Sequence, residues 1–156
     1  MTFERKVRRS PAVVWGFLTD VSALVTWVDA LVEARVAGDQ PIGVGAELVL
    51  ERRSPGTIEN VRCEITAFRA PKLIAVETRV DKRLFLDRLT LEPIPEGTLL
   101  GVYVERIYGP RAASLFARQP GLSVPSPQEW SIRKAYERSV EALVERIERD
   151  SMLPFR

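Results

Sequence analysis

The last part of the chain contains one long amphipathic helix, and its single apolar face decides what the rest of the chain must supply. Ser126, Pro127 and Glu129 form a helix start, with a capping hydroxyl, a proline at the first helical position and an acid that can complete a capping box. No glycine or proline follows until Pro154. At about 100° per residue, the apolar side chains gather on a stripe roughly 120° wide. The stripe consists of Ile132, Tyr136, Val140, Leu143, Val144 and Ile147.

Seven segments upstream of this helix alternate between apolar and polar residues, which predicts strands. The predicted strands are residues 2–9, 31–36, 47–53, 59–68, 73–80, 84–91 and 98–108. The signal Ser10-Pro11 starts a short helix over 11–19, and a second short helix is expected at about 22–28. Because the strands follow one another through short loops, we expect an α+β fold whose sheet is antiparallel and consecutive.

Composition restricts the classes of protein that this chain can belong to. A length of 156 residues predicts a single domain over 1–156, large enough for a sizeable core. The net charge is only +2, from 23 basic and 21 acidic residues that are scattered along the chain, so we expect no nucleic-acid partner. No apolar run approaches the roughly 18 residues of a membrane span, so no span is expected.

The absence of histidine is the strongest chemical restriction in this composition. With no histidine and one cysteine, Cys63, the usual zinc and copper sites cannot be built, and a Ser-His or Cys-His nucleophile is excluded. We therefore expect no metal and no cofactor. A single cysteine and no apparent signal peptide predict a reducing, cytoplasmic location. Cys63 has inward parity on its strand and is expected to be a buried, inert thiol.

Several short motifs, taken in their order, resemble the START-like or SRPBCC superfamily, in particular its polyketide cyclase/dehydrase and lipid-transport branch. Nearly the whole chain takes part in this resemblance, and its motifs are structural, with no catalytic signature among them. The matching stretches are Ser10-Pro11-Ala12-Val13-Val14-Trp15, Thr19-Asp20, Trp27, Gly45, Leu89-Thr90-Leu91-Glu92-Pro93 and Gly97-Thr98.

The resemblance implies a helix-grip fold, in which a seven-stranded curved antiparallel sheet wraps around the long C-terminal helix. Two short helices lie between the first and second strands of that fold. Sheet and helix would enclose an apolar cavity for a lipid, sterol, polyketide or similar hydrophobic molecule. The candidate ligand-binding residues are Leu50, Val61, Ile65, Val76, Leu89, Val102, Val104, Leu115, Phe116, Tyr136 and Val140. Each of them, taken singly, also fits plain core packing.

Residues 109–125 interrupt the regular pattern with three prolines and two glycines. A connection longer than about 12–15 residues is often functional. We expect Leu115 and Phe116 to contact the cavity mouth, and the segment to act either as its flexible edge or as a rigid plug.

Three functions remain open for such a chain. The first is binding or transport of a hydrophobic small molecule without chemistry. The second is a cyclase or aromatase, in which Asp87, Arg106, Tyr108 and Tyr136 are the candidate acids and bases because histidine is absent. The third is a protein-interaction module of the same fold, and a homodimer is left open by the sequence.

Alternation on the last two strands places a polar pair on the core face. A turn between these strands would set Asp87 beside Val104 and diagonal to Arg106, within reach of a long side chain. An unpaired inward carboxylate is costly, so we expect an ion pair between Asp87 and Arg106, with Arg5 and Arg52 as competing partners. That pair would lie either at a wet sheet end or at the polar end of a bound ligand.

Overall fold

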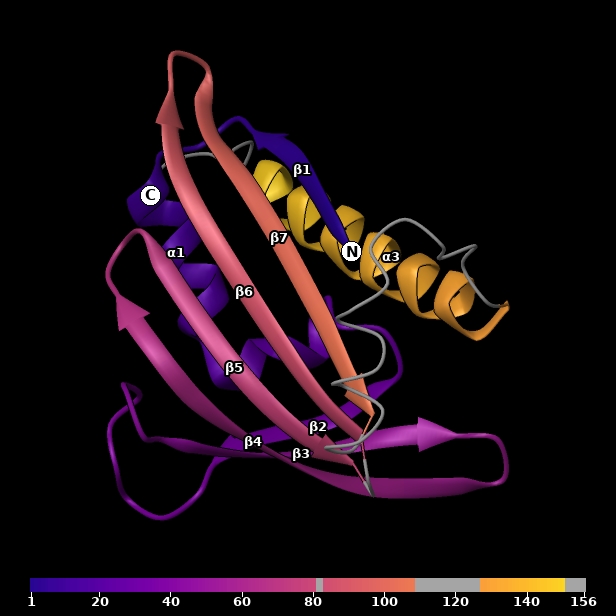
Figure 1. Ribbon diagram of the computed structural model, residues 1–156. Coiled ribbons are helices and arrows are strands. Elements are labelled where there is room, and N and C mark those ends of the chain that lie inside the picture. Colours follow the sequence, from indigo (N-terminus) through magenta and orange to yellow (C-terminus); the bar gives the residue numbers. More distant parts are fainter. Residues whose placement is uncertain (81–82, 109–126, 151–156) are drawn as a thin grey trace.

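A computed structural model describes most of the chain, and Figure 1 shows how its elements are arranged. The described residues are 1–80, 83–108 and 127–150. The expectations for the Ser126 cap, for Leu115 and Phe116, and for the side chains of Tyr108 and Glu129 lie outside the described residues.

The described elements follow the predicted order, with seven strands and a long last helix. The strands are β1 Thr2–Val7, β2 Leu31–Val36, β3 Glu47–Ser54, β4 Thr57–Arg69, β5 Leu73–Val80, β6 Arg83–Ile94 and β7 Gly97–Tyr108. The helices are α1 Pro11–Thr19, the 3-10 helix η1 Val21–Thr26 and α3 Pro127–Asp150. The predicted α+β class is therefore confirmed.

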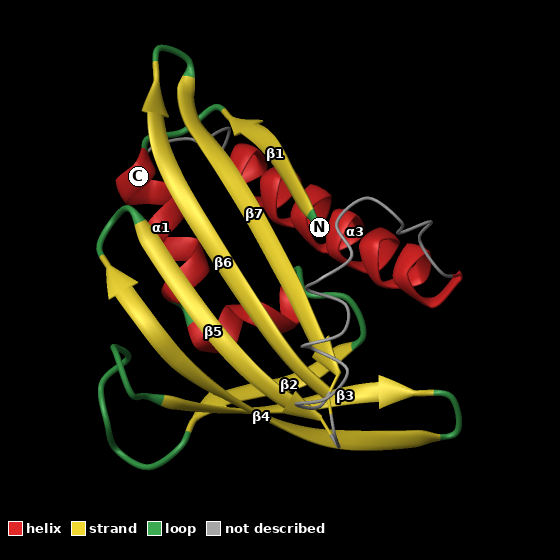
Figure 2. Cartoon of the chain, viewed as in Figure 1, coloured by secondary structure: helices red, strands yellow, loops and turns green. Residues whose placement is uncertain are grey.

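The seven strands form one antiparallel sheet in the order β1-β7-β6-β5-β4-β3-β2. Strands β2 to β7 are neighbours in the order of the sequence because short connections join them. The crossover through α1 and η1 separates β1 from β2, so these strands lie at opposite edges. Figures 1 and 2 show that the sheet is curved and that α1 and α3 lie on the same side of it. The predicted helix-grip arrangement is thus observed.

Helix α1 begins as its sequence predicts. The hydroxyl of Ser10 accepts a hydrogen bond from the backbone N–H of Val13 at 3.4 Å, and a proline occupies the first turn. The helix buries Val14 and Leu18 against the sheet. The second predicted helix is also present, as a 3-10 helix rather than an α-helix.

A β-bulge in β4 changes which side chains face the core. The register shifts between Ile65 and Ala67, and Phe68 is the residue that lies opposite the buried Ile74 of β5. Phe68 therefore turns inward and packs against Trp15 of α1, with ring centroids 5.0 Å apart. Alternation continued from Ile65 would place Ala67 on the core face, but one extra residue reverses the parity of the strand beyond the bulge.

The core consists of two apolar clusters on the concave side of the sheet. The first cluster joins β1, α1, β6, β7 and α3, and the second lies over β3, β4 and β5. Trp15 and Leu89 pack against both clusters and so connect them. The most deeply buried large side chains are Ile65, Leu100, Leu143, Ile147, Val7 and Val14.

Polar contacts also attach α3 to the rest of the fold. The backbone N–H of Asp29 donates to the hydroxyl of Ser139 at 2.8 Å, and Arg138 forms an ion pair with the Asp29 carboxylate at 3.0 Å. Arg5 of β1 forms an ion pair with Glu141. Exposed ion pairs contribute about 1 kcal/mol or less, so the apolar stripe remains the main attachment of the helix.

Truncation of Val140 tests this attachment. Val140 is 4% exposed, and Val140→Ala should lower the free energy of unfolding by about 1–3 kcal/mol through lost burial and a residual cavity. Chemical denaturation measures the loss. Glu145→Ala, which removes only an exposed ion pair with Arg149, is the control and should change stability by less than about 1 kcal/mol. Equal stability of both variants would show that α3 is not packed at this residue.

Two glycines predict opposite responses to alanine. Gly97 has φ +147°, and a Cβ there would lie 2.3 Å from the Val7 carbonyl oxygen, so Gly97→Ala should destabilise the fold by more than about 1 kcal/mol. Gly16 lies within α1 with nothing near an added Cβ, so Gly16→Ala should raise stability by about 0.5–1 kcal/mol. Thermal unfolding of the two variants checks both signs. A stabilising Gly97→Ala would contradict the close approach of β1 to the β6–β7 turn.

Candidate functional site

The candidate ligand-binding residues divide into a sealed group and an accessible group. The sealed group is at most 5% exposed and consists of Val61, Ile65, Val102, Val104 and Val140. The accessible group is partly exposed and consists of Leu50, Val76, Leu89 and Tyr136. The second group is therefore the part of this set that solvent partly reaches, and the first group is packed in the core. Whether any of these residues binds a ligand remains a prediction.

A hydrogen-bonded polar pair lies on this accessible part of the concave face. The hydroxyl of Tyr136, on α3, donates to both oxygens of the Asp87 carboxylate, at 2.8 and 3.0 Å. Asp87 lies on β6 between Val76 of β5 and Val104 of β7 in the register of the sheet. An acid with valines on both sides and a tyrosine above it has few chances to be hydrated.

Burial controls the electrostatics of this pair. Desolvation raises the pKa of Asp87 to about 6, although the Tyr136 hydroxyl and the charge of Arg52 both act to lower it. Burial also raises the pKa of Tyr136, and the neighbouring Asp87 carboxylate raises it further, so the phenol stays protonated. At neutral pH the pair therefore combines a fixed donor with an acid that titrates near neutrality.

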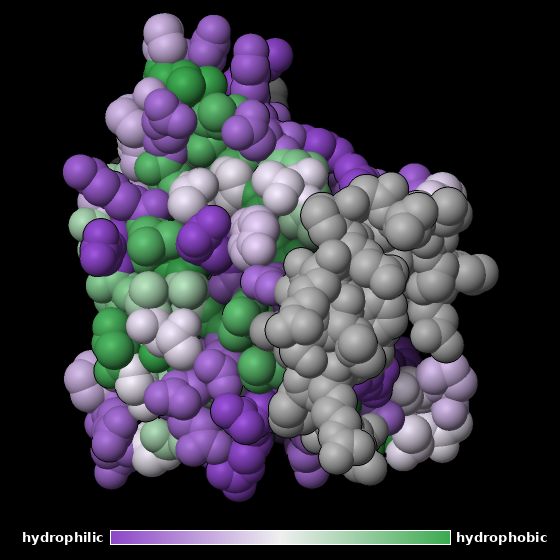
Figure 3. Space-filling view, in the orientation of Figure 1, coloured by the Kyte–Doolittle hydropathy of each residue, from purple (hydrophilic) through white to green (hydrophobic). Residues whose placement is uncertain are grey.

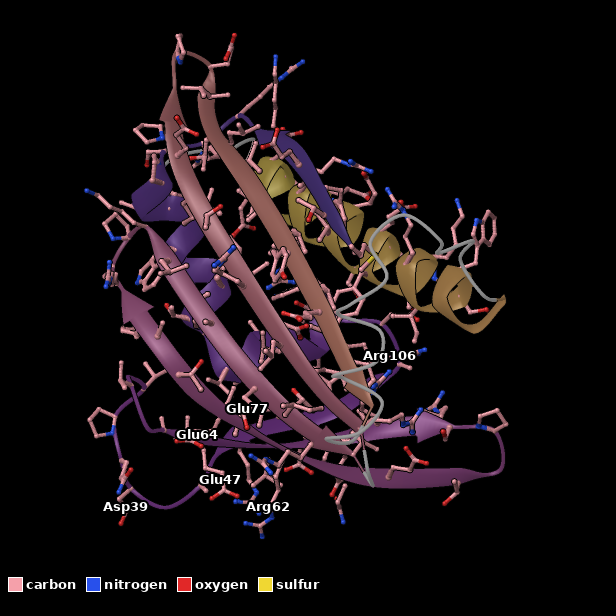
Figure 4. All side chains as sticks on the ribbon, in the orientation of Figure 1. Asp39, Glu47, Arg62, Glu64, Glu77 and Arg106 are labelled. Atoms are coloured by element: carbon pink, nitrogen blue, oxygen red, sulfur yellow. The ribbon has the colours of Figure 1, made fainter. Side chains whose placement is uncertain are left out.

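The cation that acts on Asp87 differs from the expected one. The predicted register is confirmed, since Asp87 lies opposite Val104 and Phe85 lies opposite Arg106. Even so, among the described residues the partner of the carboxylate is Tyr136, and Arg52 of β3 is the cation that lowers its pKa. Arg106 lies near the end of β7 (Figure 4), and its predicted ion pair with Asp87 is not one of the described contacts. Arg52 was expected only as a competitor.

Cys63 lies close to the same pair, on β4. Its Cα partner on β5 is Thr78, whose hydroxyl donates to the sulfur at 3.2 Å. Burial raises the pKa of the Cys63 thiol, so the sulfur is a protonated, weakly reactive group, and its predicted burial is confirmed at 4% exposure. No group of three or more cysteine or acidic side chains in the described ranges is arranged to hold a metal ion.

Two hollows lined by described residues open mainly on the other, convex face of the sheet. One of about 350 Å³ is lined by residues of β4 to β7, including Val76 and Asp87 of the candidate site: Thr66, Ala75, Val76, Leu86, Asp87, Arg88, Tyr103 and Glu105. The second is lined mainly by charged residues of β2, β3 and β4. Figure 3 shows hydrophilic and hydrophobic side chains mixed over this face. Such open, charged surfaces suit solvent, so the concave face is the better candidate for a hydrophobic ligand.

Charged rows cross the convex face from strand to strand. Glu47, Glu64 and Glu77 lie side by side on β3, β4 and β5, and Arg62 pairs with Glu47 at 2.6 Å (Figure 4). Arg79 pairs with Glu77 at 2.9 Å. These rows form a surface network of ion pairs and give carboxylates that serve as controls for Asp87.

Sequence reasoning named Asp87 and Tyr136 as separate candidates and missed their contact. The available signal was the position of Tyr136 within the apolar stripe of the helix, because a buried tyrosine hydroxyl usually needs a polar partner. Which strand would provide that partner depends on how far α3 sits from each edge of the sheet. Sequence periodicity carries no information about that distance.

The fold is a helix-grip, because a curved antiparallel sheet is closed by one long C-terminal helix. A polar pair lies on the apolar concave face of that sheet. The chain belongs to the family described as polyketide cyclase/dehydrase and lipid transport, whose model matches residues 1–148. The expected relationship is thereby confirmed. A search of curated proteins found no match.

Solved structures show the same fold at low sequence identity. Protein NE0264 from Nitrosomonas europaea is 14% identical with a TM-score of 0.71, over 98% of this chain and 96% of that one. The di-domain ARO/CYC StfQ from the steffimycin biosynthetic pathway is 11% identical with a TM-score of 0.72, over 98% of this chain and 51% of that one. Ara h 8.0201 is 14% identical with a TM-score of 0.69, over 94% of this chain and 95% of that one.

The helices of the described residues include none that combines the length and the apolar character required to cross a bilayer.

The raised pKa of Asp87 predicts a pH-dependent stability of definite sign. The pKa in the unfolded chain is near 4 and in the folded chain about 6, so the contribution of Asp87 is fully present below about pH 4 and is lost as pH rises through about 6. Asp87→Asn should therefore become more stable relative to the wild type as pH rises from about 4 to about 8.

Urea unfolding of the two proteins at several pH values measures this difference. Glu64→Gln, which changes an exposed carboxylate on the convex face, is the control and should show no such trend. A constant stability difference between Asp87→Asn and the wild type across this range would mean that the Asp87 carboxyl has an ordinary pKa.

Proposed function

We propose that this chain binds a hydrophobic small molecule on the concave face of the sheet, beside α3. The apolar part of the ligand lies over Leu50, Val76 and Leu89, and its polar end meets Asp87 and Tyr136. The family supports a hydrophobic ligand or a cyclase-type role in general. The observation that carries the proposal is the hydrogen-bonded Asp87–Tyr136 pair on an otherwise apolar surface.

The energetic position of this pair supports a binding role. A carboxylate whose pKa is raised by desolvation makes the fold less stable at neutral pH than a neutral residue would. Core packing alone does not require such a group, because the neighbouring positions in the register are filled by valines. A ligand hydroxyl that donates to the Asp87 carboxylate would offset part of this loss.

Proton transfer to the ligand is the second candidate function, and the pKa of Asp87 favours it. An acid with a pKa of about 6 exchanges its proton readily near neutral pH, which suits a general acid or base. The Tyr136 hydroxyl holds the carboxyl in a fixed orientation. In that function, the pH dependence of the turnover rate would show an apparent pKa near 6. Asp87→Asn would abolish the turnover while ligand binding persisted.

A matched pair of aromatic probes tests the binding proposal. Naphthol carries a hydroxyl that can donate to Asp87, whereas methylnaphthalene has the same shape without a donor. Because a hydrogen bond to a charged group contributes about 1.5–3 kcal/mol, Asp87→Asn should weaken naphthol binding by roughly tenfold or more and leave methylnaphthalene binding nearly unchanged. Titration by probe fluorescence gives both affinities.

Two further variants define the specificity of this result. Tyr136→Phe frees the carboxylate from its internal donor and should alter naphthol binding more than methylnaphthalene binding. Glu64→Gln, on the convex face, should affect neither probe. If Asp87→Asn weakened both probes equally, the pair would not be the polar anchor, and if wild-type protein bound neither probe, the concave face would not be the ligand site.

A further inference from the structure

The indole N–H of Trp27 is a buried hydrogen-bond donor without an acceptor. Its Nε1 atom is shielded from solvent and makes no hydrogen bond in the structure described. An indole nitrogen can only donate, and a buried donor left unpaired makes the fold less stable. Buried polar groups are nearly always paired, so this atom requires an explanation.

The chain around Trp27 is held firmly, so the unpaired donor does not result from a loose segment. The backbone N–H of Trp27 donates to the Leu24 carbonyl at 3.2 Å. Two residues later, Asp29 is attached to α3 through Ser139 and Arg138, at 2.8 and 3.0 Å. The backbone on both sides of Trp27 is therefore held, and its ring packs against the first apolar cluster.

Trp27 belongs to the same part of the interior as the proposed polar end of the ligand site. Trp27 and Tyr136 both pack, partly buried, against the apolar cluster that contains Val140 and Leu143. Ser139, which holds the segment of Trp27, follows Tyr136 by three residues on α3. Tyr136 and Ser139 therefore lie about one turn apart along the helix axis, roughly 5 Å.

We propose that Trp27 is a specificity residue, whose N–H donates to a neutral oxygen acceptor of the ligand, such as a ketone carbonyl. This inference rests on the proposed ligand site and adds to it a second polar contact of opposite character. Asp87 accepts a hydrogen bond, whereas Trp27 can only donate one. A neutral carbonyl suits this donor better than a carboxylate, because the Asp87 carboxylate carries negative charge on the same face of the sheet.

The test compares two probes that differ in one oxygen atom. Acetylnaphthalene carries a carbonyl, and ethylnaphthalene has a closely similar shape without an acceptor. In Trp27→Phe the N–H is lost while an aromatic ring remains, so the affinity for acetylnaphthalene should fall by about three- to tenfold and that for ethylnaphthalene should stay nearly constant. Trp130→Phe, at an exposed tryptophan whose ring faces Lys134 at 4.7 Å, is the matched control.

A spectroscopic measurement on the wild type keeps the test independent of how Trp27→Phe folds. In a nitrogen-15-labelled sample the indole N–H signals of the three tryptophans are resolved, and Trp27→Phe or Trp27→Tyr assigns the one that matters. Acetylnaphthalene should move the Trp27 N–H signal downfield, as expected for a new hydrogen bond, and ethylnaphthalene should not.

The outcomes separate this inference from the function on which it rests. Suppose that both probes bind the wild type, that Trp27→Phe leaves the ratio of their affinities unchanged, and that the Trp27 N–H signal responds alike to both. The Trp27 contact is then disproved, and the ligand site stands. That result is also the one expected if a water molecule already satisfies the N–H. If neither probe binds the wild type, the proposed ligand site fails and this inference fails with it.

Discussion

The apolar stripe of α3 is the constraint on which the rest of the structure depends. Leu143 and Ile147 of this stripe are 1% and 0% exposed, and they pack in one cluster with Val7 and Leu100 of the sheet. Each such side chain stabilises the fold by about 1.5–3 kcal/mol when it is fully buried. A flat sheet could cover one face of a helix only along a line. Because this sheet is curved, β1, β7 and α1 all contribute to the apolar cluster that contains the α3 stripe.

The concave face of the sheet is sealed at some residues and partly exposed at their neighbours. Around Leu143 the clusters are closed, whereas Leu50, Val76, Leu89 and Tyr136 remain partly exposed. Asp87, which accepts hydrogen bonds from Tyr136, lies on this face between the partly exposed Val76 and the buried Val104. Burial raises its pKa and so reduces stability at neutral pH. Stability and ligand recognition thus make opposite demands on one surface, where sealed and partly exposed residues are neighbours in the sheet.

Much of the fold could be predicted from alternation and capping. Ser10 and Pro11 start α1, alternation locates seven strands, and the register that places Asp87 opposite Val104 follows from the turn between β6 and β7. The bulge after Ile65 could not be predicted, because an extra residue in a strand has no clear mark in the sequence. The family relationship, in turn, supports a hydrophobic ligand in general without selecting one.

By itself, the sequence determined the class of fold, the inward parity of Asp87 and the absence of histidine chemistry. These properties depend on local periodicity and composition. Tertiary structure alone decided that Asp87 accepts hydrogen bonds from Tyr136 while the charge of Arg52 lowers its pKa, and that the Trp27 N–H is buried without an acceptor. The physical reason is that these contacts join residues far apart in the chain. They depend on how the curved sheet and the helices pack, which no local pattern encodes.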